Sequence, residues 1–157
     1  MSKMRFAEYE SPVGKLLLRS NGEALTGLWI GREAEALLEE DPVLMKTKQW
    51  LDAYFRGERP TMEIPVAMEG TAFQRVVWNL LLKIPYGKTC TYGELAREAA
   101  RLLGKEKMSA QAVGQAVGSN PVSILVPCHR VVGAGGKLTG YAWGIDRKRW
   151  LLDHEKN

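Results

Sequence analysis

Residues 71–87 read TAFQRVVWNLLLKIPYG, a stretch that predicts an amphipathic helix with a marked start and a marked end. Thr71 and Gln74 have the spacing of a capping box, in which each side chain bonds a backbone N–H of the first turn. The apolar side chains repeat at helical spacing and predict one buried face, made of Phe73, Val76, Val77, Leu80, Leu81 and Ile84. The tripeptide Pro85-Tyr86-Gly87 then ends the helix.

Three more helices are expected downstream of this stretch. A second capping-box pattern, Thr91 to Glu94, opens a helix whose inward side chains are Leu95, Ala96, Ala99, Leu102 and Leu103. A third helix covers about residues 109–118, ahead of Asn120-Pro121, and a fourth about residues 145–155. Short helices with a basic connector at Lys105 and Lys107 are typical of a helix-turn-helix module, although generic small bundles look similar.

The first part of the chain predicts a different architecture. Strand-like runs at residues 5–10, 15–19 and 24–30 are separated by turn signals, of which Asn21-Gly22 is the strongest, and predict an antiparallel meander. Asp41-Pro42 begins a helix that Gly57 ends. We therefore expect an α/β (α+β) protein with two domains. Residues 1–69 form a small antiparallel sheet with one helix, and residues 70–157 form a mostly helical winged-helix/helix-turn-helix domain.

The composition is that of a soluble globular protein, with 45% hydrophobic and 25% charged side chains in 157 residues. This excludes a collagen-like repeat and a small disulfide scaffold. No apolar run approaches the ~20 residues needed to cross a bilayer, and the start of the chain is charged where a signal peptide needs an apolar stretch. With two cysteines, the sequence predicts a cytoplasmic protein with reduced thiols and no membrane partner.

The charge is divided unevenly between the two halves. Residues 1–69 hold nine Lys/Arg against twelve Asp/Glu, a balance of −3, whereas residues 70–157 hold thirteen against six, a balance of +7. This pattern suggests that only the second half meets a polyanion; chance scatter of surface charge is the alternative. In the helix at residues 109–118, Gln111, Gly114, Gln115 and Gly118 share the exposed side. Glycine in a helix costs ~1 kcal/mol of stability per position relative to alanine, so glycines on an exposed face need an explanation. One explanation is close approach by a groove wall of nucleic acid, and the alternative is tight helix–helix packing.

The tetrapeptide Pro127-Cys128-His129-Arg130 carries the chemistry. A thiol beside a histidine and an arginine has neighbours that lower its pKa and favour a nucleophilic thiolate. On an extended segment the side chains of Cys128 and His129 point in opposite directions, so we expect a bridging water or a turn between them. The two cysteines and two histidines lack zinc-site spacing, and no metal or cofactor is predicted.

A series of short motifs runs along residues 71–155, and together they are typical of one protein family. In order, they are Phe73-Gln74, Val77-Trp78, Ile84-Pro85-Tyr86-Gly87, Thr91-Tyr92, Ala112-Val113-Gly114, Asn120-Pro121, Pro127-Cys128-His129-Arg130-Val131, Gly140-Tyr141, and Leu151-Leu152 with Glu155. In these motifs the chain resembles the 6-O-alkylguanine-DNA alkyltransferases, also called methylated-DNA–protein-cysteine methyltransferases. The first domain is similar to that family's ribonuclease-H-like N-terminal domain, but it carries few signature residues.

The resemblance implies a catalytic set. Cys128 is then the alkyl acceptor, His129 its base through a water, and Glu155 the residue that orients the histidine. Tyr92 and Tyr141 donate hydrogen bonds to the guanine, and Asn120 braces the site. The backbone of Val131 accepts from the guanine amino group. The product thioether has no easy hydrolytic route, so each molecule reacts once.

The resemblance also implies that the partner is double-stranded DNA containing alkylated guanine. The helix at residues 109–118 lies in the minor groove, the damaged nucleotide is flipped out, and the protein acts as a monomer. The residues expected to contact DNA or substrate are Thr91, Gln111, Ala112, Gly114, Gln115, Gly118, Arg130, Val131, Ala142 and Trp143.

Three positions depart from the family pattern. Gln111 stands where an arginine is common, which predicts weaker DNA binding. Trp143 stands where a glycine is common and is expected to narrow the pocket against 6-O-benzyl groups. The connector that contains Lys105 and Lys107 is longer than in many members and has no assigned role. Alternative functions are a non-catalytic winged-helix or alkyltransferase-like lesion-binding protein and a cysteine hydrolase.

Overall fold

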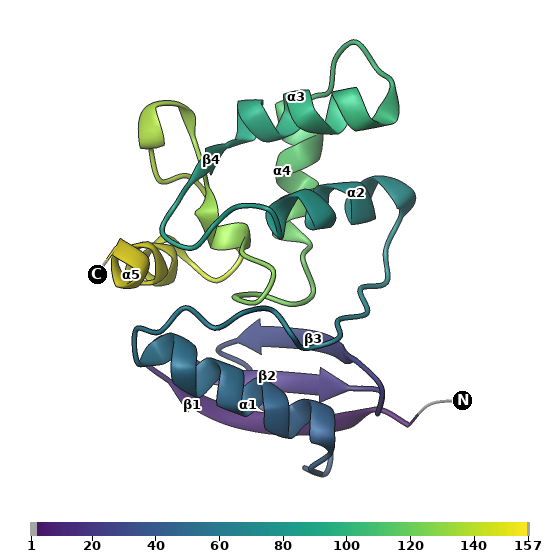
Figure 1. The fold of residues 1–157 in the computed structure, drawn as a ribbon, viewed down its shortest axis with the longest axis vertical. Coiled ribbons are helices and arrows are strands. Elements are labelled where there is room, and N and C mark those ends of the chain that lie inside the picture. Colours follow the sequence, from purple (N-terminus) through teal and green to yellow (C-terminus); the bar gives the residue numbers. More distant parts are fainter. Residues whose placement is uncertain (1–2, 157) are drawn as a thin grey trace. The chain divides into compact units, whose positions relative to one another are not determined.

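A computed structural model describes residues 3–156 of the chain (Figure 1). The chain divides into two compact units. The first contains the residues up to Glu69 together with Pro121–Ser123, and the second contains Gly70–Asn120 and Ile124–Lys156. The sequence places residues 121–123 in the second domain. No local pattern reveals that this short loop pairs with a distant strand. No helix within residues 3–156 is both long and apolar enough to cross a bilayer.

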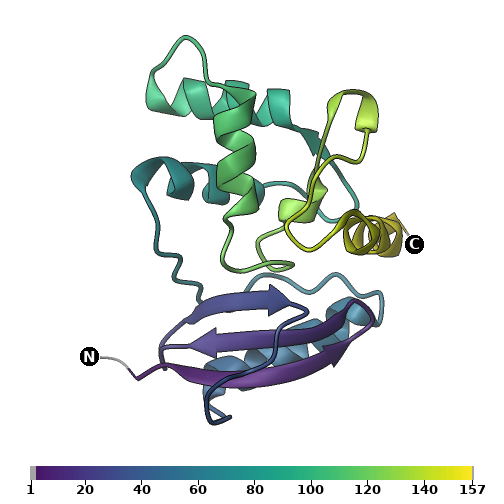
Figure 2. The same ribbon diagram turned by 180° about the vertical axis from the view of Figure 1, so that it is seen from behind.

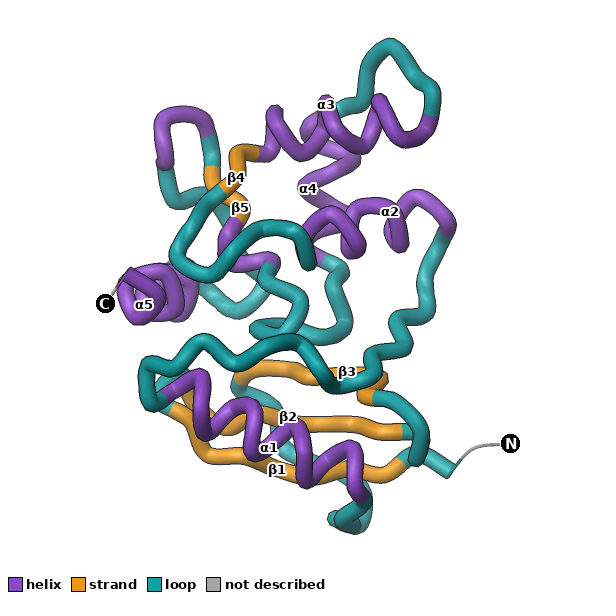
Figure 3. Tube along the Cα trace, viewed as in Figure 1, coloured by secondary structure: helices purple, strands orange, loops and turns teal. Residues whose placement is uncertain are grey.

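The first unit is the predicted antiparallel meander with one covering helix. Strands β1 (Arg5–Ser11), β2 (Gly14–Ser20) and β3 (Leu25–Ile30) pair in that order, and α1 (Pro42–Phe55) packs on one face of the sheet (Figure 3). The Pro121–Ser123 segment bonds the backbone of Leu28, which donates to Pro121 O at 2.9 Å and accepts from the Ser123 N–H at 3.2 Å.

Local capping sets where α1 begins. The Asp41 carboxylate accepts from the Leu44 N–H at 2.7 Å and from the Ser20 hydroxyl at 2.8 Å, while Pro42 occupies the first turn. Gly57 follows the helix with φ of 92°, a conformation that glycine adopts without strain. The predicted start and end of this helix are both confirmed.

The second unit is mostly helical. Its long helices are α2 (Ala72–Leu81), α3 (Tyr92–Leu103), α4 (Ala110–Gly118) and α5 (Ile145–Lys156). Both predicted capping boxes form, at Thr71 with Gln74 and at Thr91 with Glu94. Helix α4 packs on both α2 and α3, and Figure 2 shows it lying across them. The short strands β4 (Cys90–Thr91) and β5 (Val131–Val132) pair in parallel.

Residues Cys128–Arg130 form a 3-10 turn, η1, which is closed by backbone bonds from the Cys128 and Arg130 N–H groups to Val126 O and Pro127 O. A turn at this point is one of the two arrangements that the sequence predicts. One sequence expectation for this unit is wrong. Leu102 is 47% exposed, whereas Ala100 is buried in its place, because the packed face of α3 turns toward α4. The glycine-rich loop contains a second short turn, η2 (Ala134–Gly136).

Trp78 links α2 to α4, although it lies outside the buried face that the sequence predicts. It is 1% exposed, and its indole Nε1–H donates to Ala116 O at 2.8 Å. We predict that Trp78→Phe lowers the free energy of unfolding by about 1–3 kcal/mol, because it removes this hydrogen bond and shrinks the ring. Trp150→Phe, at a half-buried position on α5, changes it by less than about 0.5 kcal/mol. Urea unfolding measures both, and equal losses of stability would contradict this role.

Candidate active site

Cys128 opens the η1 turn, and hydrogen bonds hold the backbone around it. The thiol residue is 4% exposed. The Val126 carbonyl accepts from the Cys128 N–H and from the Asn120 side-chain amide, each at 2.8 Å. Asn120 therefore holds the backbone of the segment just before the thiol. Ile124, on the same segment, is buried with φ of 71°, a strained conformation for a β-branched residue.

His129, Arg130 and Glu155 form a buried network. His129 Nε2 lies 2.6 Å from Glu155 Oε2. Arg130 binds the same carboxylate with two nitrogens, Nε at 2.8 Å from Oε1 and Nη2 at 3.1 Å from Oε2. Its third contact is from Nη1 to Ile84 O at 2.7 Å. The sequence grouped Arg130 with the residues that contact DNA, but its buried guanidinium bonds Glu155 instead.

The charges of this network fix the tautomer of His129. Burial by itself raises the pKa of Glu155, but hydrogen bonds from His129 and Arg130 and the positive charge of Arg130 lower it well below its usual range. Burial lowers the pKa of His129 although Glu155 opposes the shift, so the ring is neutral. Because an ionised carboxylate only accepts, His129 Nε2 donates and Nδ1 keeps its lone pair. Nδ1 is buried and bonds none of the described residues.

Lys148 is the site residue that the sequence analysis missed. It is fully buried, and its ammonium donates to Thr139 O at 3.2 Å and lies 5.7 Å from the centre of the Tyr92 ring. Burial lowers the pKa of Lys148, and the charge of Cys128 acts in the opposite direction. A signal was present in the sequence, because Lys148, Leu151, Leu152 and Glu155 follow i, i+3, i+4 and i+7 spacing and are all buried.

The two tyrosines come from different elements. Tyr92, at the start of α3, is half-buried, and its hydroxyl donates to Gly140 O at 3.4 Å. Burial raises the pKa of Tyr92, with a smaller opposing effect from Thr139. The charge of Cys128 adds a smaller effect that also raises the pKa of Tyr92. Tyr141 begins a turn closed by the Gly144 N–H on its carbonyl at 3.0 Å, and its hydroxyl is buried.

The structure places four of the predicted DNA- or substrate-contacting residues in a helix cap, in a strand and in the turn before α5. The Thr91 hydroxyl accepts from the Glu94 N–H at 3.0 Å as the cap of α3. Val131 is buried in β5, opposite Cys90. Ala142 is exposed and Trp143 half-buried in the turn that precedes α5. Within residues 3–156, no group of histidine, cysteine and carboxylate side chains is placed to hold a metal ion.

The exposed face of α4 contains the predicted residues and bears no charge. Gln111, Gln115 and Gly118 are exposed, and Ala112 and Gly114 are half-buried. A Cβ atom at Gly118 would meet nothing within 4 Å, and one at Gly114 would lie at an ordinary 3.8 Å from the Tyr92 ring. Packing among the described residues therefore does not require these glycines, which disfavours the helix–helix packing alternative.

Comparison with known proteins agrees with this geometry. A family model described as the DNA binding domain of 6-O-methylguanine DNA methyltransferase matches residues 72–157, and the ribonuclease-like domain of the same family matches residues 4–68. A methylated-DNA--protein-cysteine methyltransferase of Methanosarcina acetivorans is 44% identical, covering 97% of this chain and 98% of that protein. One of Haemophilus influenzae is 42% identical over 99% of this chain and 88% of its own length.

A solved structure gives the same result for the fold. The crystal structure of Mycobacterium tuberculosis OGT in complex with DNA is 43% identical and superposes with a TM-score of 0.84, over 97% of this chain and 92% of that chain. The mixed α/β fold expected from the sequence is thus confirmed. Its motifs, its fold and its 44% identity to a relative over nearly the full length show that the chain belongs to the 6-O-methylguanine DNA methyltransferase family.

Proposed function

We propose that this protein repairs DNA directly, by transferring a methyl or other alkyl group from oxygen 6 of guanine to its own Cys128. The observation that carries the proposal is the buried Cys128–His129 pair, with the imidazole fixed by Glu155 so that a basic nitrogen remains available. Residues 70–157 carry the reaction in this proposal, and residues 1–69 form a separate domain.

The reaction balances with groups already in the site. His129 Nδ1 takes the thiol proton, through a water, and the Cys128 sulfur attacks the alkyl carbon. The carbon–oxygen bond breaks, and its electron pair passes into the guanine ring. A proton donated by Tyr92 or Tyr141 neutralises the leaving base, and the proton that His129 took from the thiol is returned to that tyrosine through water. The Val131 carbonyl accepts from the amino group of the base. The thioether is stable, so the protein is consumed in one turnover.

Lys148 gives this scheme its electrostatics. A buried ammonium that lies 5.7 Å from the centre of the Tyr92 ring and interacts electrostatically with Cys128 favours the thiolate over the thiol, because a nearby positive charge lowers a thiol pKa. It also lies beside the phenol that donates a proton. Lys148 is therefore a charge-setting residue that acts on both the nucleophile and the acid.

DNA binding by this chain rests on family membership and on the +7 balance of residues 70–157. We assign the contact to the minor groove and to the exposed α4 face, with the damaged nucleotide flipped toward Cys128 at a cost of a few kcal/mol. We propose that the active protein is a monomer. We also propose that it works in the cytoplasm, where reducing conditions keep the thiol reduced. A non-catalytic lesion-binding protein has no use for a buried cysteine followed by a histidine that a carboxylate holds in one tautomer.

Mass spectrometry of the intact protein tests the function. After incubation with duplex DNA containing 6-O-methylguanine, we expect one added methyl group per molecule, located on Cys128. Cys128→Ser, which keeps the side-chain shape, gains no mass but still binds the duplex. DNA binding by the wild type without any adduct would instead identify a lesion-binding protein, and turnover of an ester would identify a hydrolase.

Lys148→Gln tests the electrostatic role. Transfer at neutral pH slows by about 10- to 100-fold, because removing the positive charge raises the pKa of the Cys128 thiol. The slowing becomes smaller as pH rises, because the thiol of the variant then ionises without the help of the lysine. Lys156→Gln, on the exposed side of the same helix, keeps the wild-type profile. Slowing by one factor at every pH would show a purely structural effect.

Trp143 stays a prediction about substrate size. If its indole narrows the pocket, 6-O-benzylguanine reacts slowly relative to 6-O-methylguanine, and Trp143→Gly raises the benzyl rate by about tenfold or more, as removing a steric block worth ~1.4 kcal/mol would do. The rates of both substrates are measured on both proteins. An unchanged ratio of benzyl to methyl rates would contradict the assignment.

A further inference from the structure

The connector between α3 and α4 has no part in the proposed reaction, and yet it borders a defined groove. Helix α3 ends at Gly104, whose φ is 68°, and Ser109 caps α4 through bonds from the Gln111 and Ala112 N–H groups. Between them, residues 104–107 are exposed and Met108 is half-buried.

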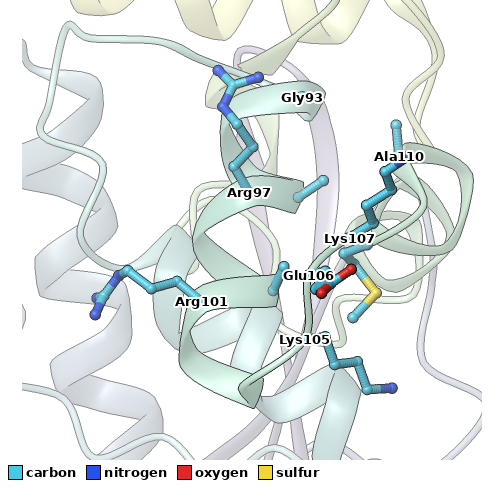
Figure 4. A pocket seen from close by; sticks show the side chains of 10 residues that line it. Gly93, Arg97, Arg101, Lys105, Glu106, Lys107 and Ala110 are labelled. Atoms are coloured by element: carbon cyan, nitrogen blue, oxygen red, sulfur yellow. The ribbon is translucent and has the colours of Figure 1, made fainter.

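The groove lies between this connector and one face of α3 and has a volume of about 730 Å³ (Figure 4). Its lining combines small residues with a basic rim. The small residues are Gly93, Ala96, Ala100 and Ala110. A narrow chain such as a sugar–phosphate backbone fits against such a surface, because no long side chain projects from these positions.

The rim carries more cations than anions. Arg97, Lys105 and Lys107 line the groove and are exposed, and none of them forms an ion pair with any residue from 3 to 156. Glu106 supplies one opposing charge. Arg101 also lines the groove, but its guanidinium is paired with Glu98. The rim therefore has an excess of positive charge.

Helix α4 places this rim beside the proposed DNA contact. Ala110, which lines the groove, directly precedes Gln111, the first residue of the uncharged exposed face of α4. Duplex DNA carries one negative charge per ~1.7 Å of its axis, and binding without sequence preference depends on cations that neutralise phosphates. The exposed α4 face supplies none, so the attraction must come from neighbouring residues.

We propose that the groove formed by α3 and the connector binds the phosphodiester backbone of the DNA strand flanking α4. The small residues contact the deoxyribose, and Arg97, Lys105 and Lys107 contact phosphates. This inference rests on the proposed function, since it takes α4 as the helix that contacts DNA. It gives the connector the charge that Gln111 does not provide.

Salt-dependent binding to undamaged duplex DNA tests the groove. Each phosphate that the protein neutralises adds about 0.9 to the slope of log K against log salt concentration, so Lys105→Gln/Lys107→Gln should reduce the slope by about 1.8 and weaken binding. Lys105→Arg/Lys107→Arg should keep the wild-type slope. The charge-matched control is Arg149→Gln/Lys156→Gln, on exposed positions of α5 outside the groove, and should also keep it.

A wild-type slope in the glutamine double variant would overturn the groove assignment. Melting temperatures of all variants are compared first, because exposed lysines should be replaceable without impairing folding. Methyl transfer to Cys128 is measured separately on the wild-type protein. Failure of transfer would overturn the proposed function, whereas the salt slope uses undamaged DNA and remains a test of the groove alone.

Discussion

One buried carboxylate, that of Glu155, connects the last helix to the turn that carries Cys128. It accepts from His129, from two nitrogens of Arg130 and from the Gly87 N–H at 3.3 Å. An isolated buried carboxylate would cost several kcal/mol, and the bidentate Arg130 offsets that cost. The same arginine also bonds Ile84 O, which lies in the segment after α2. The Arg130–Glu155 ion pair therefore connects this segment, the η1 turn and α5. The geometry of the nucleophile depends on it.

A second buried charge, of opposite sign, lies on the same face of α5. Lys148 and Glu155 are spaced i, i+7 with buried leucines between them, so a stripe that packs like a core also holds one cation and one anion. The anion bonds His129, and the cation lies 5.7 Å from the centre of the Tyr92 ring and interacts electrostatically with Cys128. In the proposed reaction, α5 therefore supplies one charge that orients the base and another that acts on the thiol.

In the proposed function, recognition and chemistry use different parts of the second unit. The exposed face of α4 is neutral and rich in glycine and glutamine, which suits close approach but gives little attraction. Positive charge gathers at Arg97 and on the connector, on residues that line the groove and take no part in the network around Glu155. The proposed groove would thus set DNA affinity through residues that do not contact the network around the thiol.

The sequence by itself determined what depends on neighbours within a few positions. The caps at Asp41, Thr71 and Thr91 form as predicted, since a cap needs only residues two or three places away. The motif around Cys128 likewise identified the family. Only the tertiary structure decided that Arg130 turns inward to Glu155 and Ile84, and that Lys148 is buried. The surroundings of such side chains depend on contacts between residues far apart in the sequence, and the local sequence pattern does not reveal these contacts.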